Sequence, residues 1–127
     1  MIPDPGELDA IIDRALAEDA VGSDATSLAL IPPTLQATVS IVTKQPGILA
    51  GLHIADAVFK RVNPDLQFVY RLQDGDRLTA EQTLATVSGS IASILSGERT
   101  ALNFLQRMSG IATLTELYVS AVDGTNA

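Results

Sequence analysis

Near the end of the sequence, three polar side chains recur at intervals of four residues: Arg99, Asn103 and Arg107. On a helix this spacing places them along one line, with two guanidinium groups beside an amide. A planar guanidinium group binds a carboxylate through two parallel charge-assisted hydrogen bonds, which a lysine cannot match. The chemistry that this polar seam offers is therefore anion binding. From the residues alone, an ordinary surface ion pair of Arg99, worth about 0–1 kcal/mol, is the more common arrangement.

The side chains around Arg99 also have structural interpretations. Glu98 points about 100° away from Arg99 on a helix, and near the start of a helical segment its charge favours the positive end of the dipole. Asn103 lies one turn from Arg99, where a hydrogen bond would fix the arginine rotamer; packing at an interface is an equal alternative. An arginine in the position of Arg107 more often forms a surface or intersubunit ion pair than a contact with a ligand.

Other reactive or charged residues form no catalytic pattern. Ser109 and Gly110 are interpreted as small residues for close helix packing, because a nucleophilic serine needs a base. His53 is the only histidine, and it falls on the solvent side of another predicted helix. Lys44 and Arg71 bring positive charge to strand ends or to the surface near an anionic ligand, an arrangement that solvation alone explains equally well.

Composition excludes several classes of protein. The 127 residues include no cysteine and one histidine, which excludes disulfides, thiolate metal sites and a cysteine nucleophile and leaves no histidine cluster for structural zinc. A net charge of −7 with only 8 basic residues argues against nucleic acid as a partner. The N-terminus lacks a basic leader region, and no apolar run approaches the ~20 residues of a membrane span. We therefore expect a cytoplasmic protein with no membrane partner.

The elements that position the polar seam follow from hydrophobic periodicity. A period of two predicts strands and a period near 3.6 predicts helices, with Pro and Gly at the boundaries. Asp24 and Thr26 lie in a stretch rich in Asp, Ser and Gly, and we interpret them as turn and capping residues. The expected order is a helix over about Gly6–Glu18, a strand over about Leu35–Thr43, a helix over about Gly51–Val62, a strand from Leu66 to Leu72 followed by the Gln73–Asp76 turn, one or two short strands from Leu78 to Gly89, and helical structure from Ser90 to about Val122.

The helix that carries the polar seam is apolar on two sides. A surface helix needs one apolar face, so a second one predicts either a deep core position or contact with a partner subunit. Strands followed by helices indicate an α+β domain over residues 1–127, with a small antiparallel sheet, helices packed on one face of it, and long helices at the end. The two apolar faces are Leu95, Leu102, Leu105 and Ala112 on one side and Phe104, Met108, Ile111 and Thr115 on the other.

Two runs on this helix, Gly97–Asn103 and Met108–Thr113, carry a resemblance to a known family. Over about a dozen positions they resemble the helix motif of the quinolinate phosphoribosyltransferases, also called nicotinate-nucleotide pyrophosphorylases (carboxylating). The similarity extends over essentially the whole chain, although Ser23 stands where the family more often has Gly. Three further stretches occur in the family's order: Leu16–Asp19, Pro46–Gly51 and Asp74–Leu78.

The resemblance implies a fold, an activity and a site. The fold is an α/β-sandwich or hammerhead-like N-terminal domain of type II phosphoribosyltransferases, which family members continue from a segment like Asp123–Asn126 into an α/β barrel. The complete enzyme joins quinolinate to 5-phosphoribosyl 1-diphosphate with Mg²⁺, whose ligands lie in the barrel, and releases diphosphate and CO₂ to form nicotinate mononucleotide for NAD. In the implied homodimer, Arg99 reaches the neighbouring subunit's active site and holds a carboxylate of quinolinate. Residues 1–127 alone should be inactive.

Two alternatives remain open beside this enzyme. A paralogue associated with molybdenum transport is similar over the same region and would bind another ligand. A non-catalytic dimerisation module would use the two-faced helix only for packing. The stretch Asp74–Val87 also resembles lipoyl and biotinyl carrier domains, but those carry the cofactor on a lysine at a hairpin tip, and no lysine follows Lys60.

Overall fold

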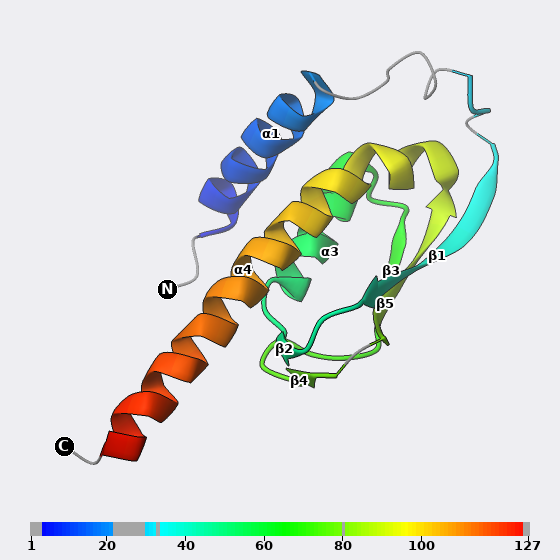
Figure 1. Cartoon of the computed structure of the whole chain (residues 1–127). Coiled ribbons are helices and arrows are strands. Elements are labelled where there is room, and N and C mark those ends of the chain that lie inside the picture. The colour runs from blue at the N-terminus through cyan, green and yellow to red at the C-terminus, as the bar shows by residue number, and fades with distance from the viewer. Residues whose placement is uncertain (1–3, 22–29, 33, 80, 126–127) are drawn as a thin grey trace.

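The computed structural model describes residues 4–21, 30–32, 34–79 and 81–125. Asp24 and Thr26, which were predicted to be turn residues, lie outside these ranges. Ser23, where the family more often has Gly, lies outside them as well. Figure 1 shows α3 and α4 on the same side of the sheet, with α1 along the outside of the helices. The elements are α1 (Pro5–Val21), β1 (Gln36–Thr43), β2 (Gly47–Ile48), α3 (Leu52–Val62), β3 (Gln67–Tyr70), β4 (Arg77–Leu78), β5 (Gln82–Ser90) and α4 (Ile91–Thr125).

The sheet is antiparallel, in the order β1-β5-β3, and its two faces differ in polarity. Val87 and Ala85 of β5 are fully buried on the face that meets the helices. On the opposite face, the side chains of Thr38 and Ser88 are cross-strand partners that share a hydrogen bond of 2.9 Å. This alternation is the period of two read from the sequence. The predicted α+β class, with helices on one face of a small antiparallel sheet, is confirmed.

A second, two-stranded sheet was not predicted. β2 pairs with β4 through only two residues on each strand, which is too short for periodicity to reveal. The predicted Gln73–Asp76 turn is present, because the Asp76 carboxylate accepts the Gln73 N–H at 2.8 Å. The Asp74 carboxylate of this turn also accepts the N–H of Leu52 at 2.8 Å, so it caps α3. The turn therefore fixes the start of a core helix.

The helix α3 is amphipathic and supplies the centre of the core. Its buried residues Leu52, Ala55, Val58 and Phe59 recur with helical spacing. The Phe59 ring lies 6.1 Å from that of Phe68 on β3, which joins helix and sheet.

Arg61 at the C-terminal end of α3 ties this helix to α1. Its guanidinium group donates two hydrogen bonds to Asp13, at 2.7 and 2.8 Å. Arg61 holds the pKa of the Asp13 carboxyl below its ordinary value of 3.8. Because the folded-state pKa is the lower one, this contribution to stability is present above that value and is lost as the pH falls through the folded pKa.

Helix α4 is continuous over 35 residues, and Gly97 and Gly110 do not interrupt it. Ile94, Ala101 and Leu105 on its inner side are buried. No helix in the described ranges has the length and apolarity needed to cross a bilayer.

Of the two alternatives for the second apolar face of α4, a deep core position is not found among the described residues of this chain, and contact with a partner subunit stays a prediction. Leu105 of the first face is 5% exposed, but Leu95 of the same face is 43% exposed. On the second face, Ile111 is 60% exposed. The apolar surface left uncovered is concentrated in the C-terminal half of the helix, and we call Ile111, Leu114 and Leu117, which are 60–69% exposed, the apolar strip.

Gly97 and Gly110 offer a matched pair of substitutions on one helix. A Cβ at Gly97 would lie 3.2 Å from Phe59 and Val62, whereas a Cβ at Gly110 would meet nothing within 4 Å. We expect Gly110→Ala to raise the free energy of unfolding by about 1 kcal/mol through helix propensity. Gly97→Ala should lower it, because overpacking costs about 1–3 kcal/mol. Urea denaturation of this chain measures both, and equal effects would contradict the close packing at Gly97.

Candidate functional site

Arg99 projects from a turn of α4 whose neighbouring residues face the core. Gly97, Thr100 and Ala101 are buried, whereas the Arg99 side chain is exposed. Within the described ranges, the ion pairs do not include Arg99. The ordinary surface ion pair that the residues alone favoured for Arg99 is therefore not found in this part of the chain. A guanidinium group on a rigid turn is left available to a ligand or to another subunit.

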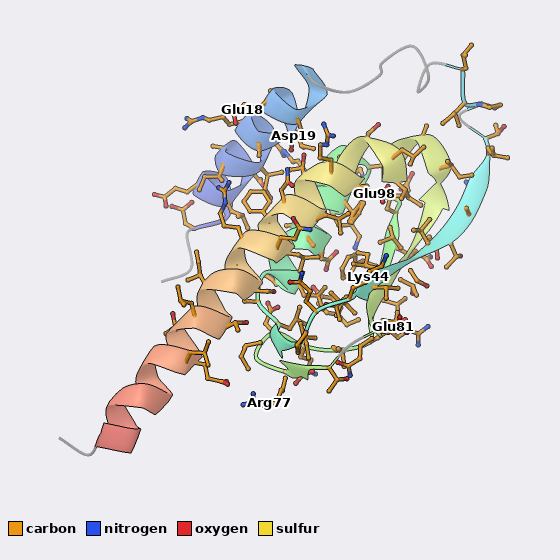
Figure 2. All side chains as sticks on the ribbon, viewed as in Figure 1. Glu18, Asp19, Lys44, Arg77, Glu81 and Glu98 are labelled. Atoms are coloured by element: carbon orange, nitrogen blue, oxygen red, sulfur yellow. The ribbon has the colours of Figure 1, made fainter. Side chains whose placement is uncertain are left out.

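The three residues of the polar seam are all exposed on α4, but only two of them border the same hollow. Asn103 and Arg107 line a small hollow of about 120 Å³ between α4 and the end of α1, and Arg99 does not. Among the described residues no hydrogen bond joins Asn103 to Arg99, which leaves packing at an interface as the other alternative for Asn103. Residues four apart on a helix are not fully aligned, so each member of the seam is rotated a little further around the helix axis, and the two ends of the seam point in different directions. Figure 2 shows Glu18 and Asp19 of α1 on the other wall of this hollow.

Glu98 does not have the position expected of it. α4 begins at Ile91, so Glu98 lies about two turns inside the helix and outside the range of the positive N-terminal dipole. Its side chain is half-buried (Figure 2).

A contact that sequence reasoning missed lies beside Arg99. The hydroxyl group of Thr100 donates a hydrogen bond to the Asp19 carboxylate of α1, across 81 positions of the chain. Both residues belong to stretches that were singled out, Leu16–Asp19 and Gly97–Asn103, but neither stretch indicates that the two meet. The only sign of this contact in the sequence was that Thr100, a polar residue, occupies a helix position that faces the core.

The Pro46–Gly51 loop docks onto α4 through hydroxyl groups. The Ser109 hydroxyl accepts the N–H of Ala50 at 2.9 Å and donates to its carbonyl at 3.0 Å, and the Thr113 hydroxyl accepts the N–H of Ile48 at 2.9 Å. Ser109 therefore binds backbone and is no nucleophile. Gly110 is exposed, with open space around its Cα, so the prediction that it serves close packing is wrong within the described chain.

The runs Pro46–Gly51 and Met108–Thr113, which both carry the resemblance, therefore lie against each other in the fold. The family described as quinolinate phosphoribosyl transferase, N-terminal domain, matches residues 24–109. The chain belongs to this family.

Relatives and solved structures agree with this family. The chain is 42% identical to the chloroplastic nicotinate-nucleotide pyrophosphorylase [carboxylating] of Arabidopsis thaliana, over 91% of this chain and 33% of that protein. It is also 42% identical to the enzyme of the same name from Mycobacterium leprae, over 95% of this chain and 45% of that protein. NadC from Streptococcus pyogenes superposes with a TM-score of 0.88 at 38% identity, covering 97% of this chain and 44% of that one. The chain thus spans between a third and a half of these relatives.

A wide depression in this quinolinate phosphoribosyl transferase domain lies between the β1–β2 connection and the part of α4 from Leu102 to Leu117. It is a groove of about 770 Å³, with Leu102, Leu105 and Leu114 among its apolar lining residues. Lys44 lies on its rim and is exposed, as expected of a residue at a strand end (Figure 2). Two of the three residues of the apolar strip, Leu114 and Leu117, also line this groove.

The remaining titratable residues of the domain form surface contacts. His53 is exposed, as predicted, and its Nδ1 lies 3.5 Å from the Tyr70 hydroxyl. Tyr70 donates to Asp56 at 2.8 Å, and burial together with this hydrogen bond raises the pKa of the Tyr70 hydroxyl. In the described ranges, no three His, Cys, Asp or Glu side chains gather as metal ligands.

Proposed function

We propose that this domain binds one carboxylate of quinolinate through Arg99, as part of a longer phosphoribosyltransferase. In the proposed reaction, quinolinate and 5-phosphoribosyl 1-diphosphate give nicotinate mononucleotide, diphosphate and CO₂. The observation that carries the proposal is the exposed Arg99 guanidinium group, without an ion pair in the described chain, within a motif that matches the family. The names of the Arabidopsis and Mycobacterium relatives support the reaction.

The chemistry of the substrate suits an arginine. Quinolinate carries two carboxylates on one ring, and a guanidinium fork holds a carboxylate in a defined plane. Fixing that plane orients the ring nitrogen toward the sugar carbon that it attacks, which raises the effective concentration of the reacting atoms. If the site excludes water, the charge interaction becomes stronger. In this proposal Arg99 binds and orients, and the groups that take part in bond making lie elsewhere in the enzyme.

The proposed site needs a second body, and we infer that this body is another subunit. The Arg99 side chain is exposed and borders neither the groove nor the small hollow described above, so we expect a site built around it to be completed from outside. The apolar strip on the same helix supports an association, because exposed apolar side chains in a row are typical of interfaces. A homodimer in which each domain serves its partner's site is the arrangement we propose.

Self-association of this chain is a direct prediction. We expect light scattering to report a dimer or larger species, since the apolar strip is 60–69% exposed in a single copy. Leu114→Glu together with Leu117→Glu should shift the chain to monomer by placing charge in the contact. Exposed Val69→Glu on the sheet is the matched control and should leave the association unchanged. A clean monomer for the unmodified chain would contradict the proposal.

The other parts of the proposal rest on the resemblance. The resemblance implies that the ligands of Mg²⁺ lie in the barrel of the longer enzyme, where the ion would neutralise the diphosphate that leaves. A cytoplasmic location is proposed, although the Arabidopsis relative is named chloroplastic.

Calorimetry of the complete enzyme distinguishes the proposal from its alternatives. Titration with quinolinate should release or absorb heat with a stoichiometry of one per subunit. Heat with molybdate and none with quinolinate would favour the transport-associated paralogue. Heat with neither ligand would favour a dimerisation module and would overturn the proposed function.

A further inference from the structure

Thr100 uses its hydroxyl group differently from other hydroxyl residues on α4. Ser96 and Thr113 each donate to the backbone carbonyl one turn earlier, at 2.8 Å, which is the usual arrangement inside a helix. Thr100 instead donates to Asp19 of α1. It is also the one polar side chain that is buried among the described residues, at 1% exposure. Burying a hydroxyl group is costly unless it is hydrogen-bonded, so the position of Thr100 depends on Asp19.

The position of Asp19 is also unfavourable by local rules. It lies in the last turn of α1, where the negative end of the helix dipole disfavours a carboxylate, and that turn contains no basic residue. Among the ion pairs of the described chain, none involves Asp19. A residue that violates local preference and is satisfied only across the fold is typical of a functional position.

The Thr100–Asp19 hydrogen bond holds the turn of α4 that carries Arg99. On one side of this turn, Gly97 packs so closely on α3 that a Cβ would lie 3.2 Å from Phe59. On the other side, Thr100 is bound to α1. Arg99 lies between these two contacts in sequence and projects to the outside. Rotation of α4 about its axis would displace the guanidinium group, and binding sites tolerate only about 0.5 Å and 10–20° of such error.

We propose that the hydrogen bond between Thr100 and Asp19 is a positioning contact, through which α1 sets the direction of Arg99 toward the substrate carboxylate. This inference rests on the proposed function of Arg99. Thr100 and Asp19 do not touch the substrate in this account. Their effect is on the orientation of a group that does, so it should appear in the binding of quinolinate and not in that of 5-phosphoribosyl 1-diphosphate.

The test compares variants of the complete enzyme by steady-state kinetics and thermal unfolding. Thr100→Val keeps the shape and removes the hydroxyl group, and we expect the KM for quinolinate to rise about tenfold, with kcat and the KM for the other substrate within about twofold. Asp19→Asn keeps an acceptor without the charge and should raise the same KM by a smaller factor. Thr100→Ser keeps the hydroxyl group and should restore the original KM to within about twofold. Ser96→Ala, on the exposed side of the same helix, is the matched control and should change nothing.

Arg99→Ala in the same assay separates the two proposals. If Arg99→Ala leaves the KM for quinolinate unchanged, the proposed function fails and this inference fails with it. If Arg99→Ala raises that KM while Thr100→Val and Asp19→Asn lower only the unfolding midpoint, the positioning inference alone is overturned. Should Thr100→Val not fold, Asp19→Asn decides the question, because it removes the charge of the acceptor: a raised KM for quinolinate supports the inference, and an unchanged KM overturns it.

Discussion

Arg99→Ala is expected to weaken quinolinate binding to the complete enzyme by more than about 2 kcal/mol, because it leaves a substrate carboxylate without its partner in a shielded site. The Arg99 side chain is exposed and outside the ion pairs of the described chain, so its removal should break no contact that holds this domain together. The unfolding midpoint of the variant should therefore match that of the parent. Calorimetry with quinolinate measures the first effect, and thermal unfolding measures the second.

Two further substitutions show whether the fork or only the charge matters. Arg99→Lys keeps the charge but not the paired hydrogen bonds, so its affinity for quinolinate should lie between those of the parent and Arg99→Ala. Arg71→Ala removes an exposed arginine at the end of β3 and should leave the affinity within about twofold, since long-range charge is screened by salt. If Arg71→Ala weakens binding as much as Arg99→Ala does, the effect is one of net charge, and Arg99 has no specific role.

Gly47→Ala should cost the domain about 2–4 kcal/mol of unfolding free energy, the largest effect that we expect of any methyl group added to this chain. Gly47 has φ +151, which L-residues rarely adopt, and a Cβ there would lie 2.5 Å from the Thr113 hydroxyl oxygen. That hydroxyl group binds Ile48 and the carbonyl of Ser109. Moving it breaks the contact between the Pro46–Gly51 loop and α4.

Gly75→Ala is the matched control for this prediction. Gly75 also has a positive φ, of +96, but nothing lies within 4 Å of where its Cβ would be. It should therefore cost only about 1 kcal/mol, the price of the backbone conformation. Urea denaturation of the three proteins measures the difference. Adding Thr113→Ala to Gly47→Ala should be less than additive if the clash is the cause. Equal costs at the two glycines would show that Thr113 is not close-packed on the loop.

Most of the secondary structure of this domain could be predicted from local periodicity. β1 was expected over about Leu35–Thr43 and is Gln36–Thr43, and α3 was expected over about Gly51–Val62 and is Leu52–Val62. Alternation along a strand and the 3.6-residue repeat of a helix are properties of consecutive residues, so they are visible in one sequence. The strands β2 and β4, with two residues each, contain too few positions to show any period.

The motifs of the sequence indicated the family but not what each motif residue does. Ser109 was expected to serve helix packing, and it binds both backbone groups of Ala50. Gly110 was expected to serve the same purpose, and it faces open space. A motif shows which residue types occur together, whereas the role of each depends on which other segment lies against it.

By itself, the sequence determined the helices, the main strands, the α+β class and the presence of an arginine at position 99 on a helix, because all of these depend on residue types and their spacing along the chain. Only the tertiary structure decided that Thr100 meets Asp19 from 81 positions away, and that Ser109 and Thr113 bind the backbone of the Pro46–Gly51 loop. The physical reason is that burial and hydrogen bonding between distant segments arise when helices pack at particular angles. Such angles depend on the whole set of core side chains, and no short stretch of residues encodes them.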